Sequence, residues 1–198
     1  MKSNVLTVIA GALALVTASA AEIGAAAPPF AAKDTKGAAV SLADQKGKIV
    51  VLEWVNYDCP FVKKHYSSGN MPSLQSAYTA KDVVWITVNS AAEGKEGYLE
   101  PSKFGELAAT KGNKASHIIV DGDGKIGKAY GAKTTPHMFI INKEGTLVYN
   151  GAIDSKATTE NADVATADKL FANALDAVIA GKTVENAKNQ PYGCGVKY

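Results

Sequence analysis

The segment from residue 49 to residue 66, IVVLEWVNYDCPFVKKHY, constrains the fold of this chain more than any other. Its first half is a run of β-branched and apolar residues, which predicts a buried strand, and its second half opens with Pro60 and continues with helical spacing. Cys59 therefore lies where a strand ends and a helix begins, with Asp58 as the expected cap. Backbone N–H groups and the helix dipole favour a thiolate at such a junction, which makes Cys59 a candidate reactive cysteine. The alternative is a small buried hydrophobe, because unpaired cysteine is among the most buried residue types.

Further strand and helix patterns follow this segment in alternation. Buried strands are predicted at residues 82–89 and 116–120, and helices at residues 101–112 and 126–130. The order strand, helix, strand, helix, strand predicts a parallel sheet with right-handed crossovers.

Two hairpins and a final helix flank these units. The sequence predicts one hairpin within residues 30–42 and a second one formed by residues 137–142 and 146–152. Residues 161–180 carry an apolar stripe at helical spacing, which predicts one amphipathic helix that covers a face of the sheet. The tail, residues 183–198, shows no periodicity.

The first residues have the features of a secretory signal peptide. Lys2 gives a positive start, residues 5–16 form an apolar run too short to span a membrane comfortably, and Ala18-Ser19-Ala20 is a small-residue cleavage signature. We therefore expect residues 1–21 to be a signal peptide. Its removal after export would leave a periplasmic protein with no membrane span in the mature chain.

One domain, at residues 22–182, is expected to account for the mature chain apart from the tail. The net charge of +2 is too small to indicate a nucleic-acid partner. All 21 basic residues are lysine. The missing arginine removes bidentate guanidinium recognition of carboxylate, phosphate or peroxide from any mechanism.

Two cysteines, Cys59 and Cys194, remain after export to an oxidising compartment, so they can pair. A permanent bridge would stabilise the fold by about 4–5 kcal/mol in the chain-entropy model, which is reason enough for a structural disulfide. A structural disulfide does not need a cysteine at a strand-to-helix junction, however, and this favours a cycling redox couple. The two glycines around Cys194 are expected to leave its backbone free to move.

These features resemble the thioredoxin-like redoxins, which lie between the peroxiredoxins and the membrane-anchored thiol reductases. The matching segments are Ala-Pro-Pro-Phe at residues 27–30, the Gly-Lys before the central strand, Cys59-Pro60-Phe61-Val62, Tyr130-Gly131 through Thr135-Pro136, and Asn142-Lys143-Glu144-Gly145. Together they cover most of residues 27–180. The resemblance implies the α/β thioredoxin fold, with a central mixed β-sheet flanked by helices and an N-terminal β-hairpin extension.

The resemblance also implies a cis peptide bond before Pro136, with the proline lying against the redox cysteine. In that fold the proline presents the backbone edge of Thr135 to an extended substrate or partner. The residues alone leave open a trans proline at the head of a strand. His137 follows the proline directly and is expected to approach Cys59 and tune it.

Two departures from related families limit what the resemblance implies. Thiol reductases use C-x-x-C, but Val62 takes the fourth position, so Cys59 has no neighbour for a short-loop disulfide. Peroxiredoxins place a threonine three residues before the cysteine and bind peroxide with an arginine, whereas this chain has Asn56 and no arginine. Asn56 can donate a hydrogen bond, and Lys63 or Lys64 can supply positive charge.

We therefore expect an exported, peroxiredoxin-like thiol-disulfide redox protein that needs no cofactor and no metal. Cys59 attacks a peroxide or a partner protein's disulfide, Cys194 resolves the product as an intramolecular disulfide, and an external thiol reductant restores both thiols. The residues expected to contact the substrate or partner are Asn56, Pro60, Thr135, Pro136 and His137.

Two other functions fit parts of the pattern. A binding module without catalysis would hold Cys59 and Cys194 as a permanent disulfide. A copper-binding chaperone would combine Cys59 with His65 and His137, but copper-handling proteins of this fold carry two cysteines close together and this motif has one. His65 is expected at the surface or in a loop, and His117, at the head of a strand, is expected to be structural.

Overall fold

The computed structural model describes residues 21–198. The predicted signal peptide, residues 1–21, lies outside the described residues apart from its last position. In the part of the chain that is described, no helix is long and apolar enough to cross a membrane.

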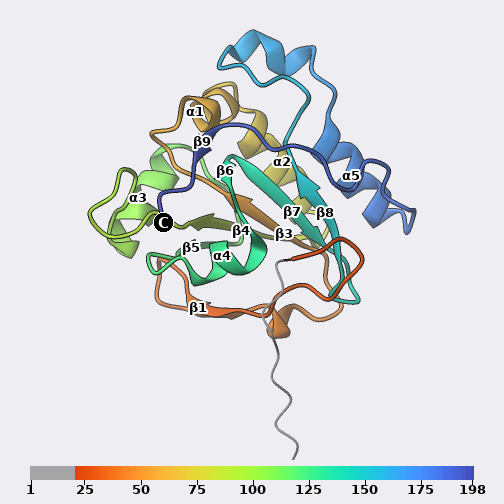
Figure 1. Cartoon of the computed structure of the whole chain (residues 1–198), viewed down its shortest axis with the longest axis horizontal. Helices are drawn as coiled ribbons and strands as arrows, with labels where there is room; N and C mark the ends of the chain where they lie inside the picture. Colours follow the sequence, from red (N-terminus) through yellow and green to blue (C-terminus); the bar gives the residue numbers. More distant parts are fainter. Residues whose placement is uncertain (1–20) are drawn as a thin grey trace, which may run out of the picture.

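A five-stranded mixed sheet forms the centre of the molecule, in the order β5-β4-β3-β7-β8 (Figure 1). Its strands are β3 (Val50–Trp54), β4 (Val84–Asn89), β5 (His117–Val120), β7 (His137–Ile141) and β8 (Leu147–Gly151). β3, β4 and β5 run parallel, as the alternating patterns predicted, and the β7–β8 hairpin joins β3 in antiparallel orientation. β3 and β4 are buried along their whole length, which explains their continuous apolar runs. The mixed sheet that the resemblance implied is confirmed.

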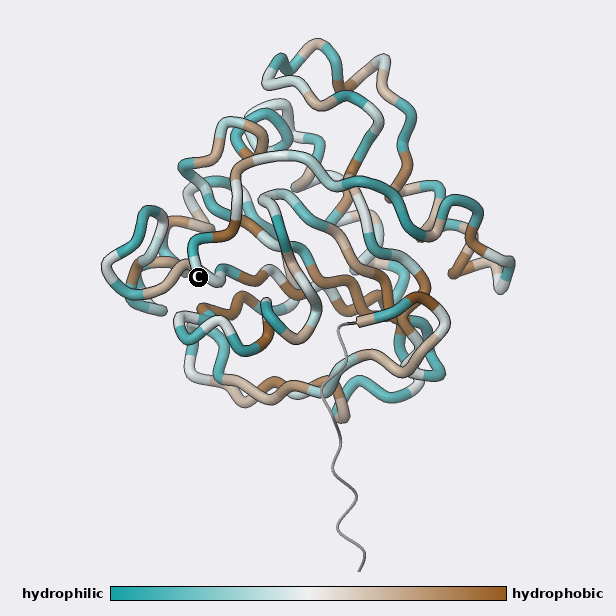
Figure 2. Tube along the Cα trace, viewed as in Figure 1, coloured by the Kyte–Doolittle hydropathy of each residue, from teal (hydrophilic) through white to brown (hydrophobic). Residues whose placement is uncertain are grey.

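Helices cover both faces of this sheet and bury two apolar clusters. The helices are α1 (Pro60–Ser67), α2 (Asn70–Thr79), α3 (Pro101–Thr110), α4 (Lys125–Tyr130) and α5 (Leu170–Ile179). On one face α1, α2, α3 and α5 pack on side chains such as Val51 and Trp85. On the other face α4 and the N-terminal hairpin pack on side chains such as Leu52. Figure 2 shows hydrophobic residues concentrated in the strands between these two layers.

The N-terminal hairpin is present as predicted and is tied to the edge of the sheet. It consists of β1 (Ala31–Lys33) and β2 (Ala39–Ser41), followed by a 3₁₀ turn, η1 (Ala43–Gln45). In its turn, Asp34 Oδ2 lies 3.1 Å from His117 Nδ1 on β5. This contact gives His117 the structural role that was expected of it.

The single helix predicted over residues 161–180 is wrong in its first half. Asn161–Ala165 form a 3₁₀ turn, η2, and the regular helix α5 begins only at Leu170. Between them, the backbone N–H of Asp168 donates to Ser155 Oγ at 2.9 Å, and its carbonyl accepts the N–H of Ser155 at 3.1 Å. These bonds tie the chain to the loop after β8 and compete with the helical hydrogen-bond pattern.

The C-terminal tail is fixed on the domain, although its sequence has no periodicity. Cys194–Gly195 form a short strand, β9, that pairs antiparallel with β6 (Thr134–Thr135). Upstream, the backbone of Asn150 in β8 donates to the carbonyl of Ala187 at 2.9 Å and accepts the N–H of Asn189 at 3.2 Å. Figure 1 shows the tail leaving α5, passing α1 and ending near α4.

Candidate redox site

Cys59 lies beyond the carboxyl end of β3, where it is the N-cap residue of α1. Its backbone is extended (φ −64°, ψ 124°) and Pro60 takes the first helical position, so the free N–H groups of the first turn lie near the sulfur. No side chain caps this helix, and the expectation that Asp58 would do so is wrong. Asp58 is exposed, whereas Cys59 is only 1% exposed. The junction predicted from the sequence is therefore present, with the sulfur itself in the cap position.

The peptide bond between Thr135 and Pro136 is cis, as the resemblance implied. The carbonyl oxygen of Thr135 accepts a hydrogen bond from the Cys59 thiol, with 3.0 Å between Sγ and the oxygen. The cysteine and the cis-proline segment are thus direct neighbours.

Cys194 reaches the same place from the tail. In β9 it stands opposite Thr135, whose hydroxyl donates to the Cys194 carbonyl at 3.5 Å. Both cysteines are free thiols, and the Cys194 thiol lies close enough to Cys59 to act as a hydrogen-bond donor that lowers the Cys59 pKa. The fold therefore brings together the two cysteines that the sequence marked as a pair.

The two thiols have opposite pKa shifts. Burial raises the pKa of Cys59, but hydrogen bonding with Cys194, Thr135 and nearby backbone N–H groups outweighs burial and holds the pKa below the ordinary thiol value. Burial raises the pKa of Cys194 to about 11, aided by its hydrogen bond to Cys59 and the negative charge there. Of the two thiols, Cys59 is therefore the one that loses its proton first, while Cys194 keeps its proton. An attacking and a resolving cysteine need this division.

We expect Cys194→Ala to raise the pKa of Cys59, because the thiolate loses a hydrogen-bond donor. The midpoint of the Cys59 alkylation profile should move upward by roughly one pH unit, whereas Cys194→Ser, whose hydroxyl can still donate, should move it less. Iodoacetamide rates measured across the pH range, with the alkylated peptide identified by mass, give the midpoint. Equal midpoints in the wild type and both variants would contradict the assigned hydrogen bond.

Asn56 holds the loop before Cys59. Its Oδ1 accepts the backbone N–H of Asp58 at 2.9 Å, and its Nδ2 donates to the carbonyl of Glu96 at 3.5 Å. Pro60 serves as the first residue of α1. Both residues thus position the segment around the sulfur, and the hydrogen bonds of Asn56 go to the loops on either side.

His137 does not take the role expected of it. Its ring is buried, Nε2 lies 2.8 Å from Asn150 Oδ1, and Nδ1 accepts the backbone N–H of Lys133 at 3.2 Å. Burial lowers the pKa of His137 to about 4, so the ring is neutral at neutral pH. Because both ring nitrogens are engaged elsewhere, we correct the expectation that His137 tunes Cys59.

His65 is buried, which corrects its expected surface position. Its side chain is 1% exposed, with Nε2 3.0 Å from the Tyr192 hydroxyl and Nδ1 2.9 Å from Asn70 Nδ2. Burial lowers the pKa of His65 to about 4. Across residues 21–198, no three histidine, cysteine or carboxylate side chains gather at metal-binding distance, so Cys59, His65 and His137 do not converge as ligands.

Lys64 and Asp154 form a buried ion pair beside the tail, which sequence reasoning missed. Lys64 Nζ lies 3.5 Å from Asp154 Oδ2, and the two side chains are 0% and 7% exposed. The hydroxyl of Tyr192 donates to Asp154 Oδ1. The charge of Lys64 is balanced by Asp154. Neither Lys64 nor Lys63 is a main cause of the Cys59 pKa shift, so the positive charge expected from them does not act on the sulfur.

Glu53, on β3 upstream of Cys59, is a second residue that was missed. A carboxylate within a run of apolar strand residues was the available signal. It is fully buried and accepts hydrogen bonds from Tyr66 Oη at 2.9 Å, Gln75 Nε2 at 2.8 Å and Trp85 Nε1 at 2.8 Å. This network fixes α1 and α2 on the sheet behind Cys59.

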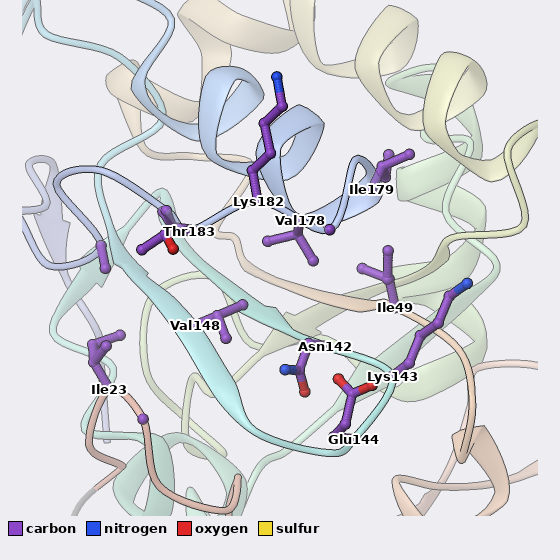
Figure 3. A pocket seen from close by; sticks show the side chains of 14 residues that line it. Ile23, Ile49, Asn142, Lys143, Glu144, Val148, Val178, Ile179, Lys182 and Thr183 are labelled. Carbon is purple, nitrogen blue, oxygen red and sulfur yellow. The ribbon is translucent and has the colours of Figure 1, made fainter.

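A hollow of about 490 Å³ lies at the opposite end of the sheet from the cysteines (Figure 3). The side chains of Ile49, Val148 and Val178 face into it, while Lys143 and Lys182 extend away from it. Neither cysteine borders this space. The hollow is therefore separate from the candidate redox site.

A family model described as redoxin matches residues 22–170. The chain belongs to the redoxin family. This assignment confirms the resemblance, and it agrees with the cysteine at the N-cap of α1 and the neighbouring cis-proline. No curated protein is significantly similar in sequence to this redoxin.

Several solved structures share the fold of this redoxin. A conserved uncharacterized protein from Geobacillus kaustophilus has a TM-score of 0.74 at 26% identity, covering 89% of this chain and 92% of that chain. A hypothetical protein from Sinorhizobium meliloti 1021 has a TM-score of 0.72 at 24% identity, covering 91% and 96%. A candidate thiol:disulfide interchange protein from Chlorobium tepidum has a TM-score of 0.52 at 24% identity, covering 66% and 85%. These similarities confirm the thioredoxin-like fold.

Proposed function

We propose that this redoxin is an exported thiol-disulfide redox protein in which Cys59 attacks and Cys194 resolves. The proposal rests on one observation. Two free thiols with opposite pKa shifts lie together beside Thr135. A purely structural disulfide needs neither a helix cap position nor unequal acidity. The candidate interchange protein that shares the fold supports thiol chemistry. The predicted signal peptide supports a periplasmic location.

With a peroxide as oxidant, the Cys59 thiolate attacks one peroxide oxygen and the O–O bond breaks. The sulfur loses two electrons and becomes a sulfenic acid, and the leaving oxygen takes a proton to give water or an alcohol. The Cys194 sulfur then attacks the sulfenic sulfur. An S–S bond forms, and the departing hydroxyl leaves as water with the Cys194 proton. An external dithiol returns two electrons and two protons.

With a disulfide as oxidant, the Cys59 thiolate attacks one sulfur of the partner. The partner's S–S bond breaks, one partner thiolate leaves and takes a proton, and a mixed disulfide forms. Cys194 attacks the Cys59 sulfur of this mixed disulfide, gives up its proton and releases the second partner thiol. The partner is reduced by two electrons and the Cys59–Cys194 disulfide is formed, as in the peroxide reaction.

Steady-state turnover with a dithiol reductant tests the division of labour between the cysteines. We expect the wild type to consume hydrogen peroxide or a low-molecular-weight disulfide repeatedly. Cys194→Ser should turn over more slowly, because without Cys194 the sulfenic acid or mixed disulfide on Cys59 must be reduced directly by the external dithiol. Comparison of the two oxidants identifies the substrate class. Unchanged turnover in Cys194→Ser would contradict the resolving role.

A further inference from the structure

We propose that Tyr192 and Gly193 are positioning residues that hold Cys194 beside Cys59 and thereby close the Thr134–Thr135 edge to an extended partner. This proposal rests on the proposed function and explains how the C-terminal tail would select the oxidants that reach Cys59. While the tail is seated, only a small oxidant can reach Cys59, and a protein partner must first displace β9.

Tyr192 anchors the tail on the α1 side of the cysteine pair. Its hydroxyl donates to Asp154 Oδ1 and lies 3.0 Å from His65 Nε2. Its ring packs edge-to-face on Phe61 with 5.7 Å between centroids, and Lys64 Nζ lies 5.5 Å from the ring centroid. Because the side chains of Asp154 and His65 are buried, withdrawing the Tyr192 hydroxyl would leave both without a partner they now share.

The tail supplies one of the partners of this buried cluster. Lys64 Nζ donates to the carbonyl of Lys156 at 2.8 Å, which fixes the ammonium group. Asp154 Oδ1 accepts hydrogen bonds from the Tyr192 hydroxyl and, at 3.0 Å, from the backbone N–H of Lys156. Asp154 Oδ2 is buried and has no hydrogen-bond partner within the described residues, although Lys64 Nζ lies 3.5 Å away. Removal of the tail would therefore cost the cluster part of its already incomplete pairing.

Gly193 lets the tail pass directly over the Thr135 carbonyl. Its φ of +134° lies where side-chain-bearing residues rarely occur, and a Cβ at this position would overlap the Thr135 oxygen and come within 2.7 Å of the Thr135 carbon. This carbonyl is the one that accepts the Cys59 thiol. The role of Gly193 is therefore close approach, which differs from the backbone mobility expected from the sequence.

A second anchor lies beyond Cys194. The Tyr198 hydroxyl donates to the carbonyl of Ala132 at 2.8 Å, and its ring lies against Gly124 and Gly127 of the α4 segment. The cysteine is thus held between two tyrosine contacts, with β9 paired to β6 between them. The crevice left beside Thr135 under the tail measures only about 10 Å³, about enough for a single water molecule.

The two glycines that flank Cys194 offer a matched experiment. Gly193→Ala places a methyl group against Thr135, whereas Gly195→Ala meets nothing closer than the Lys133 carbonyl oxygen at 4.0 Å. The first readout is the equilibrium constant of the Cys59–Cys194 disulfide against glutathione in the full mature chain. The second is the rate at which a bulky polyethylene-glycol maleimide alkylates Cys59 in the reduced protein, relative to iodoacetamide.

We expect Gly193→Ala to lower the effective concentration of Cys194 at Cys59 by about tenfold or more, and to raise the relative rate of the bulky reagent by a similar factor. Gly195→Ala should stay within about twofold of the wild type in both readouts. Tyr192→Phe, which keeps the ring and loses the hydroxyl, should shift both readouts in the direction of Gly193→Ala and provides a second test if that variant folds poorly.

Equal values for the two alanine variants would overturn the proposal. If the wild type forms no Cys59–Cys194 disulfide, the proposed function fails. The alkylation of the reduced protein still tests independently whether the tail covers Cys59. Faster alkylation of Cys59 by the bulky reagent in Gly193→Ala, with no change in Gly195→Ala, would then show that the tail closes the Thr134–Thr135 edge, whatever the outcome for the disulfide.

Discussion

Cys59→Ser is expected to abolish the reduction of both peroxide and disulfide substrates and to leave the fold intact. Serine has nearly the same size, and its hydroxyl can keep the hydrogen bond to the Thr135 carbonyl. It has no accessible anionic form near neutral pH and cannot form a disulfide, so both proposed reactions lose their first step. Substrate consumption in the presence of a dithiol reductant, measured beside circular dichroism of the same sample, checks the result.

Cys194→Ser is the matched control for this variant. It removes the second thiol and keeps the Cys59 thiol, so the first oxidation step should survive there and be missing from Cys59→Ser. Residual turnover in Cys59→Ser would mean that Cys194 or another group carries the chemistry, which contradicts the assigned roles.

Glu53→Ala is expected to reduce the free energy of unfolding by about 3–5 kcal/mol, the largest effect on stability of any substitution considered. The Glu53 carboxylate accepts hydrogen bonds from Tyr66, Gln75 and Trp85 inside the core, and the alanine variant leaves these donors unpaired. Glu53→Gln keeps one acceptor oxygen and most of the volume, so it should lose less. Urea unfolding of the three proteins gives the comparison, and equal midpoints would contradict the network.

The same carboxylate predicts a pH dependence of stability. Burial raises the pKa of Glu53 to about 7, against the opposing hydrogen bonds, from a value of 4.5 for an ordinary glutamate. A raised pKa in the fold means that the stabilising contribution is fully present below about pH 4.5 and is lost as the pH rises to about 7. The stability of the wild type relative to Glu53→Gln should therefore fall by about 3 kcal/mol across this interval. A constant difference would contradict the raised pKa.

Local patterns predicted most of the architecture. The apolar runs of β3 and β4 and the proline that opens α1 are properties of short segments, so the sequence alone was enough to place the cysteine at the start of α1. The cis bond before Pro136 required the resemblance, because the residues alone favour a trans proline at the head of a strand.

Long-range contacts account for what was missed. His65 looks like an exposed residue within α1, but the fold places Tyr192 of the tail and Asp154 of the loop after β8 beside its ring. The first half of the helix predicted over residues 161–180 fails because Ser155 captures the backbone of Asp168. Neither contact leaves a periodic trace in the sequence, since the partners come from other elements.

Peptide mapping by mass spectrometry tests the central claim most directly. The reduced, full mature chain is treated with one equivalent of hydrogen peroxide and then with a dithiol. We predict a single disulfide between Cys59 and Cys194 of the same monomer, formed on oxidation and removed by the dithiol. A sulfenic acid on Cys59 that persists before the dithiol is added, with Cys194 still a free thiol, would contradict the account, as would two thiols that remain unchanged.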